Sequence, residues 1–179
     1  AGNPLVSEVS YKDGIVHFTS DGTEGNTVLA AFDAKGEVIW SWHLWMTDQP
    51  ELFAYDEGGE LMDRNLGATS ALEADGAASF GLLYQWGRKD PIPGSVDGSN
   101  KEIDAIFDGN GVSFSIDKNG GGNLDNTIKY PTTFYTSMRL ADNSWGPETK
   151  TIYDPCLDGW RVPDFTSDVT KNIFQGFSN

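Results

Sequence analysis

The sequence is poor in the residues on which most catalytic and metal sites depend: it has one cysteine, Cys156, and two histidines, His17 and His43. A lone cysteine excludes an intrachain disulfide framework and any zinc site built from two or four cysteines. The histidines lie far apart in separate apolar runs, and the HExxH and GxSxG motifs are absent. We therefore interpret both histidines as ordinary half-buried side chains and predict that the protein is not an enzyme.

Basic residues are also scarce. Twelve Lys and Arg residues stand against 27 Asp and Glu residues, which gives a net charge of −15 and a pI of about 4.2. Phosphate backbones and anionic membrane surfaces repel such a chain, so nucleic acids are excluded as partners. Solubility alone explains the acidity, and binding of a divalent cation would need a dedicated loop of ligands.

Long apolar runs are missing as well. No stretch of the sequence reaches the roughly 18 apolar residues of a membrane-spanning helix, so no transmembrane segment is expected. The sequence begins Ala-Gly-Asn-Pro-Leu, without the basic and apolar parts of a signal peptide. Any export signal or lipid anchor is therefore expected to have been removed.

The residues that are present are typical of a loop-rich globular protein with strands. The 179 residues are 12% aromatic and include 21 glycines and 8 prolines. Disordered chains are poor in aromatic residues, and a chain of this length can bury a substantial core. We expect one large domain, or a small β-unit followed by a domain of ordinary size.

The first third of the chain is predicted to form β-strands. An apolar run at 15–18 follows the turn residues Asp13 and Gly14, and runs at 27–32 and 37–45 meet across a short turn with a glycine, which is a hairpin pattern. In the run 37–45, alternate residues form one wholly apolar face and one mixed face. This pattern predicts a central strand that is covered on both sides.

A polar stretch separates this region from the rest. Residues 49–60 are broken by Pro50 and a glycine pair, and we interpret them as a connector. It would join an N-terminal β-unit, residues 1–48, to a second domain, residues 61–179.

The second domain is predicted to contain a short strand and two helices. The strand covers 61–66. Apolar residues recur at helical spacing over 79–87, where Gly87 can end the helix, and again in a tail helix that begins after Pro163.

Residues 94–150 are the least regular part of the chain, with many Gly, Asn, Asp and Ser residues and β-like runs at 111–116 and 127–130. A loop region this long inside a compact domain is usually functional or mobile. Its aromatic, amide and charged residues suit a sugar-binding surface, since ring faces stack on the CH face of a sugar while polar groups bind its hydroxyls. The candidate ligand-binding residues are Tyr135, Arg139, Asp142, Asn143 and Trp145. The alternative is that Trp145 fills the fold.

The same region offers weak calcium ligands. Asp117, Asn119 and Asp125 carry the hard oxygen atoms that Ca²⁺ prefers. An EF-hand needs a carboxylate at the twelfth position from Asp117, where Ile128 stands, so that motif fails. A solvated loop is the default interpretation, and no cofactor is expected.

Cys156 is not predicted to be a nucleophile. Asp154 and Asp158 flank it in sequence, and their carboxylates would raise the pKa of the thiol. A buried structural role is the prediction. Among the arginines, Arg88 is expected to bond the last carbonyls of the helix before it.

Four stretches resemble a known type of domain: 40–48 (WSWHLWMTD), 62–68 (MDRNLGA), 81–91 (GLLYQWGRKDP) and 152–163 (IYDPCLDGWRVP). In this order they resemble the fimbrillin-like domain that is widespread in secreted and lipid-anchored Bacteroidetes proteins, and they are similar to the Fibrobacter succinogenes major paralogous domain. The resemblance implies an α+β, C-type-lectin-like fold related to formylglycine-generating enzymes. It also implies a role in adhesion or ligand display at the cell surface.

In these stretches the arginines are expected to have buried carboxylate partners. Arg64 and Arg161 are each expected to pair with Asp63, Asp90 or Asp154, because a buried arginine needs a counter-charge. On this interpretation the four stretches are scaffold rather than site.

Two departures qualify the resemblance. Catalytic members of the wider fold use a pair of cysteines, and Cys156 stands alone, so that activity is not expected. A lectin-like domain also continues into more strands than remain before Asn179. We therefore expect either a truncated or processed chain, or strands supplied by residues 94–150.

The leading hypothesis is a secreted or cell-surface adhesion module that binds a glycan or a host or matrix protein through residues 94–150. The second is a structural pilus or assembly subunit. A carbohydrate-active enzyme is the third, and it would require two carboxyl groups facing each other across a cleft.

Overall fold

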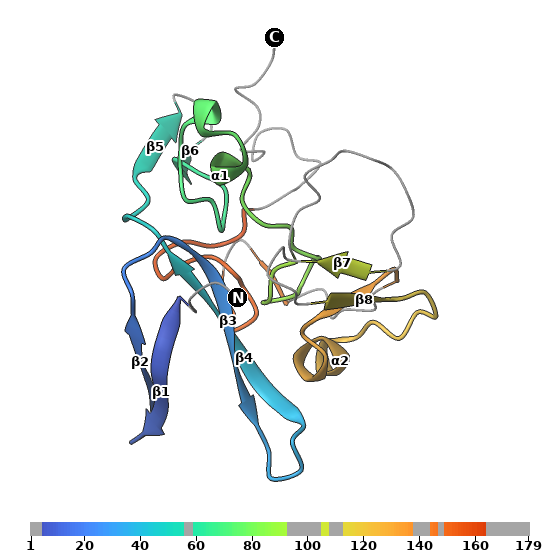
Figure 1. Cartoon of the computed structure of the whole chain (residues 1–179). Helices are drawn as coiled ribbons and strands as arrows, with labels where there is room; N and C mark the ends of the chain where they lie inside the picture. Colours follow the sequence, from blue (N-terminus) through green and yellow to red (C-terminus); the bar gives the residue numbers. More distant parts are fainter. Residues whose placement is uncertain are drawn as a thin grey trace.

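The protein is an α+β, loop-rich chain built from small, mostly antiparallel sheets and short helices (Figure 1). The computed structural model describes residues 5–55, 59–92, 105–107, 113–137, 144–146 and 149–163. The elements are β1 (Val6–Lys12), β2 (Ile15–Ser20), β3 (Gly25–Phe32), β4 (Val38–Met46), β5 (Leu52–Tyr55), β6 (Gly59–Met62), η1 (Glu73–Asp75), α1 (Ala77–Phe80), β7 (Ala105–Phe107), β8 (Ser113–Asp117), α2 (Leu124–Lys129) and β9 (Thr133–Tyr135). Across these described residues, no helix has the length and apolar content to cross a bilayer.

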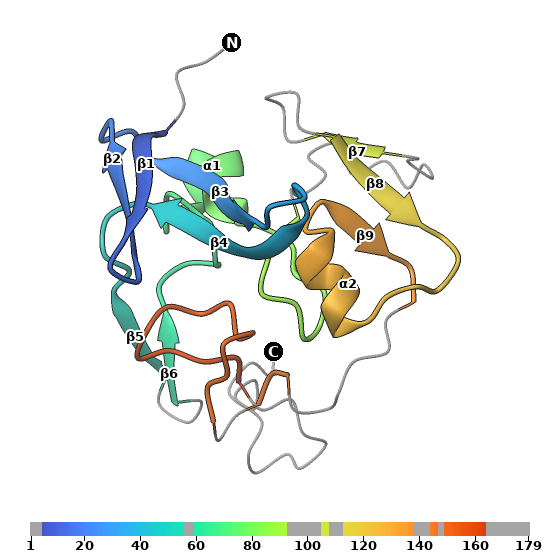
Figure 2. The same ribbon diagram turned by 90° about the horizontal axis from the view of Figure 1, so that it is seen from below.

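Three hairpins and one three-stranded sheet make up the β-structure of the described residues. The hairpins are β1–β2, β3–β4 and β5–β6, and the sheet has the order β7-β8-β9, in which β8 and β9 are parallel. Figure 2 shows the β7-β8-β9 sheet and α2 on the opposite side of β3–β4 from the β1–β2 hairpin.

The β1–β2 hairpin follows from its turn residues. Asp13 and Gly14 both have positive φ, 54° and 82°, as the tight hairpin turn with a right-handed twist requires. The apolar side chains of this hairpin remain largely in solvent: Tyr11 is 74% exposed and Ile15 57%. His17 also lies on this hairpin and is exposed, so its predicted half-buried position is wrong.

The β3–β4 hairpin is confirmed. Its strands pair from Gly25 opposite Met46 to Ala31 opposite Trp40, and Asp33 closes the turn by accepting from the N–H groups of the residues that follow it. The prediction that the second strand is central is wrong, since β4 pairs only with β3 within the described residues. The helix α2 and the segments around Lys89 and Asp154 lie against β4 in place of further strands, and the side chain of Ile39 stays in solvent.

Residues 49–60 are not a plain connector. They contain β5 and the first half of β6, which pair from Leu52 opposite Met62 to Tyr55 opposite Gly59. The predicted strand at 61–66 correspondingly ends at Met62. Apolar and polar residues alternate only weakly in this hairpin. Pro50 and the glycines are therefore the stronger local pattern, and they predict a connector rather than strands.

The helix predicted over 79–87 is wrong beyond its first residues. α1 ends at Phe80 because Gly81 has a φ of 71°, and a Cβ there would come within 2.7 Å of the carbonyl oxygen of Leu66. The chain then turns back, so that Leu83 and Ile92 exchange two backbone hydrogen bonds of 2.9 and 2.7 Å. Long-range pairing therefore overrides a helical spacing of apolar residues.

In the predicted irregular region, β8 confirms the expected run at 111–116, but the β-like run at 127–130 lies mostly in α2. The side chain of Asn123 caps this helix by accepting from the N–H of Asn126 at 2.8 Å. The predicted tail helix lies outside the described residues.

The most deeply buried segment is 87–92, which we call the central segment. Arg88 is 0% exposed, and it donates to the carbonyl oxygens of Pro131 and Thr133 beside β9. The prediction that Arg88 bonds the carbonyls of its own helix is therefore wrong. On the other side, Lys89 and Asp90 contact Ser41 of β4, so one short segment ties two parts of the fold together.

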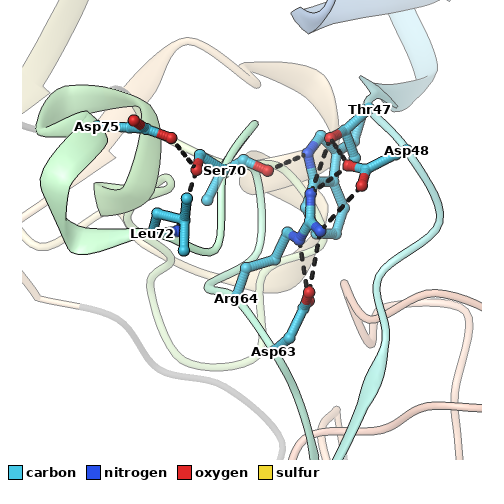
Figure 3. Close-up of polar contacts among 9 residues, drawn as sticks. Thr47, Asp48, Asp63, Arg64, Ser70, Leu72 and Asp75 are labelled. Carbon is cyan, nitrogen blue, oxygen red and sulfur yellow. Dashed lines mark hydrogen bonds and ion pairs between the residues drawn. The ribbon is translucent and has the colours of Figure 1, made fainter.

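A second charged contact joins the ends of β4 and β6. Arg64 donates two hydrogen bonds of 2.9 Å to Asp63 and also bonds Thr47 and Asp48, as Figure 3 shows. The hydrogen bonds from Arg64 hold the pKa of the Asp48 and Asp63 carboxyl groups below the usual value. The predicted pairing of Arg64 with Asp63 is confirmed, whereas Arg161 is exposed and its predicted burial is wrong.

The central segment can be tested by Asp90→Asn, which removes the counter-charge of Lys89 and preserves the size of the side chain. Removal of one partner of a buried ion pair costs about 3–5 kcal/mol, because the remaining charge is buried without compensation. We expect the free energy of unfolding, measured by urea titration at neutral pH, to fall by that amount.

Lys129→Ala is the control, since Lys129 and Glu37 form an exposed pair at 2.8 Å that should contribute little. Its urea midpoint should match that of the parent protein. Equal losses for the two variants would contradict a special contribution of the buried pair.

Candidate functional site

A cavity of about 190 Å³ opens along β4 and is bounded by three separate parts of the chain. We call it the tryptophan pocket. Residues from both faces of β4 line it, so it lies along the edge of that strand that β3 does not cover. Its lining residues are Trp40, Ser41, Trp42, His43 and Trp45 of β4, then Tyr84, Lys89 and Asp90, and finally Ile152, Asp154, Pro155 and Leu157. The last of these segments is drawn in orange-red in Figure 2, where it runs beside β5 and β6.

The aromatic side chains of the pocket differ in how firmly they are held. Trp45 donates from its ring nitrogen to the carbonyl oxygen of Ala68 at 2.9 Å, and Trp40 packs at a tilt against Tyr153 with ring centres 6.1 Å apart. Trp42 is 37% exposed. The pocket thus combines two fixed indole rings with one that faces solvent.

The polar base of the pocket is a closed cluster of Ser41, Lys89 and Asp90. The Lys89 ammonium lies 2.5 Å from Ser41 Oγ, 2.8 Å from the Ser41 carbonyl oxygen and 2.7 Å from Asp90 Oδ2. The Ser41 hydroxyl in turn lies 3.0 Å from both oxygens of Asp90. All three ammonium protons are therefore used inside the cluster.

Lys89 also supports the aromatic wall. Its ammonium lies 4.6 Å from the centre of the Trp40 ring, within the range of a cation–π interaction. Burial lowers the pKa of Lys89, and the adjacent Asp90 carboxylate opposes this by favouring the charged form. The lysine therefore holds the Trp40 ring in place from below.

His43 belongs to a chain of hydrogen bonds that fixes its tautomer. Asn26 donates from Nδ2 to the carbonyl oxygen of Gly67 at 2.7 Å, so its Oδ1 accepts from His43 Nε2 at 2.8 Å. The other ring nitrogen, Nδ1, then accepts from the Tyr84 hydroxyl at 3.2 Å. Burial lowers the pKa of His43 to about 4, with Asp90 acting in the opposite direction, so the ring is neutral near pH 7. The predicted half-buried His43 is confirmed.

The third wall of the pocket is organised by Asp154. Its carboxylate accepts from Lys150 at 3.0 Å and from the backbone N–H groups of Cys156 and Val162 at 2.8 and 3.0 Å. Burial raises the pKa of the Cys156 thiol to about 12, and Asp154 adds to the effect. The expected direction of this shift agrees with these contacts, although Cys156 is half-buried rather than fully buried as predicted.

The predicted ligand-binding residues lie elsewhere or outside the described part of the chain. Tyr135 and Trp145 are buried. The Tyr135 hydroxyl donates to the carbonyl oxygen of Asn126, and Trp145 Nε1 donates to the carbonyl oxygen of Tyr153 at 2.7 Å. This placement of Trp145 agrees with the alternative that it fills the fold. Arg139, Asp142 and Asn143 lie outside the described residues, and a role of all five in ligand binding stays a prediction.

The weak calcium candidates are spread over one loop and the start of a helix. Asp117 Oδ1 accepts from the N–H of Asn119 at 2.7 Å, and Asp125 lies in the first turn of α2. Among residues that the structure describes, no three His, Cys, Asp or Glu side chains gather in a way that could hold a metal ion.

Sequence reasoning missed the pocket residues Trp40, Trp42 and Trp45. The signal was present, since three indoles within six residues are an unusual density for one strand. The alternation of this run by itself predicts only its burial.

Comparison with protein-family models, with curated proteins and with solved structures finds no match to the chain.

The buried His43 predicts a specific pH dependence of stability. Its pKa is about 4 in the folded protein and 6.5 in the unfolded chain, so the unfolded chain binds more protons between these values. The contribution of His43 to the free energy of unfolding is therefore fully present above pH 6.5. It is lost as the pH falls toward 4, at about 1.4 kcal/mol per pH unit. Urea titrations at pH 7 and pH 5 should differ by roughly 2 kcal/mol from this group alone.

His43→Gln should flatten this difference, whereas His17→Gln, at an exposed position, should leave it unchanged. An unchanged pH dependence in His43→Gln would show that other groups cause it.

The raised pKa of Cys156 predicts an unreactive thiol. A shift from 9.0 to about 12 lowers the thiolate fraction near neutral pH by about 1,000-fold. The reaction rate with a disulfide reagent such as DTNB should rise by that order when the protein is unfolded in urea. Comparable rates in folded and unfolded protein would contradict the burial of the thiol.

Proposed function

We propose that this protein is a non-enzymatic binding module of a secreted or cell-surface protein, and that it recognises a glycan through the tryptophan pocket. The observation that carries the proposal is the composition of the pocket, in which indole rings surround polar groups that already satisfy one another. Small-molecule sites are typically concave and aromatic with a few placed polar groups. Sugars suit such a site, because their CH faces stack on rings while their hydroxyls reach polar atoms.

The state of the reactive groups supports binding rather than catalysis. A nucleophile needs a base with a free lone pair beside it. Lys89 is held as an ammonium by Asp90, and both nitrogens of His43 are hydrogen-bonded. The Cys156 thiol has its pKa raised to about 12. Two carboxylates, Asp90 and Asp154, line the pocket as a carbohydrate-active enzyme would require, but each is bound by lysine and other donors.

The four stretches that resemble the fimbrillin-like domain meet at this pocket. Residues 40–48, 81–91 and 152–163 supply its lining, and 62–68 supplies the carbonyl oxygens that hold Trp45 and Asn26. This convergence supports a shared site as well as a shared scaffold. The resemblance also supports a C-type-lectin-like fold and display at the cell surface.

Trp42→Ala tests the proposal, since Trp42 is the exposed ring of the pocket. Parent and variant proteins are applied to a broad glycan array, and the variant should lose at least about tenfold in signal on the glycans that the parent binds, as expected for an aromatic hot spot. Trp86→Ala is the matched control, because Trp86 is an exposed tryptophan that packs against Trp145 outside the pocket.

Equal losses for both variants, or none for Trp42→Ala, would remove the pocket from the binding site. If the parent protein binds no glycan on the array but binds a matrix-protein array, its ligand is a protein.

A structural pilus or assembly subunit is the second candidate, and the β1–β2 hairpin favours it. Val9, Tyr11, Val16 and Phe18 lie toward one face of this hairpin, and three of them rank among the exposed large apolar residues. Exposed apolar patches of this kind often mark protein contacts. In light scattering, an average mass that rises with protein concentration and is lower in the Tyr11→Ser variant would favour the assembly role over glycan binding.

A further inference from the structure

The tryptophan pocket has a charge and a size that select among glycans. Resting on the proposed function, we infer that it takes one uncharged sugar ring at the end of a glycan and rejects acidic sugars such as uronic and sialic acids. The argument rests on the ions that line the pocket, on its volume and on the exposure of its rim.

Among the described residues that line it, the pocket offers no free cation to an acidic sugar. The ammonium of Lys89 is the positive group of the lining, and its protons go to Ser41 and Asp90. Next to the lining, Lys150 is bound to Asp154 and to the carbonyl oxygen of Cys156. An incoming carboxylate would therefore have to break one of these bonds to find a partner.

The negative groups add to this selection. Asp90 and Asp154 both line the cavity, and the whole chain carries a net charge of −15. An anion brought into this field without a counter-charge loses its water and meets like charges. Because the side chains of Asp90 and Asp154 are 2% and 0% exposed, they act on an anion through their field rather than by direct contact, and an uncharged sugar ring does not meet this repulsion.

The volume limits the ligand to a single ring. The cavity of about 190 Å³ is well below the roughly 300–1,000 Å³ of sites for drug-sized ligands. One pyranose ring fills such a space and a disaccharide exceeds it. The rim carries Trp42 and Ile152, which is 70% exposed, so the rest of a glycan can continue into solvent.

The first experiment compares oligosaccharides with the same core and different terminal rings: neutral hexose, N-acetylhexosamine, uronic acid and sialic acid. Titration calorimetry with the whole chain should give affinities at least about tenfold higher for the neutral ends, since an unpaired charge in the site costs more than 1.4 kcal/mol. The free neutral monosaccharide should compete within about threefold of its oligosaccharide, because one ring makes most of the contacts.

A rim variant supplies a gain of binding. Ile152→Lys adds a cation beside the pocket at an exposed position, so binding of acidic ends should increase. Leu72→Lys, at a position that is 64% exposed and not part of the pocket lining, should leave it unchanged.

The outcomes separate this inference from the function on which it rests. Tight binding of acidic ends that Trp42→Ala abolishes would overturn the inference and leave the glycan-binding pocket standing. A monosaccharide far weaker than a disaccharide would overturn the single-ring limit. The absence of binding to any oligosaccharide of the panel would overturn both proposals.

Discussion

Lys89 and Asp90 form an ion pair of 2.7 Å beneath β4, where almost no part of either side chain reaches solvent. Ser41 closes the pair from β4, and the neighbouring Arg88 extends the same segment to the carbonyl oxygens beside β9. The small sheets share few apolar contacts, and buried polar residues are as numerous as buried apolar ones among the described residues. Their relative positions therefore depend on directional bonds, which specify geometry more sharply than non-directional apolar burial does.

The same interaction connects the scaffold to the site. Lys89 lies over the Trp40 ring, and Trp40 forms one wall of the pocket. The four resembling stretches therefore line or support the pocket as well as holding the fold together, and whether they are scaffold alone stays a prediction. A tryptophan that is fixed from below loses little conformational entropy when a ligand stacks on it, which favours affinity without large contact area.

Local chemistry made the turns of β1–β2 and β3–β4 predictable, whereas the β5–β6 hairpin and the long-range pairing after α1 were not. Asp13 and Gly14 specify a turn on their own, as do the residues around Asp33. The spacing of apolar residues after Ser79 suggests a helix, but Leu83 pairs with Ile92 and Gly81 takes a backbone conformation that ends α1, and neither is visible in a local window. The burial of Trp145 was unpredictable for a related reason. Its neighbours in sequence are polar, but sequence context does not say where a ring points, and its indole is buried.

The β1–β2 hairpin lies outside the network centred on Lys89 and Asp90. The N–H of Asp21 donates to the carbonyl oxygen of Leu5 and closes the base of the hairpin itself, and a side-chain contact from Ser20 to Met46 joins the hairpin to β4. Most side chains of the hairpin are in solvent. Two-stranded hairpins are marginally stable by themselves in water. The hairpin can therefore open and close while the remainder stays folded. Its amide protons exchange with solvent through local opening, which has a low free-energy cost, whereas opening of β4 has a higher free-energy cost. The molecule thus has two levels of stability, and the pocket belongs to the higher one.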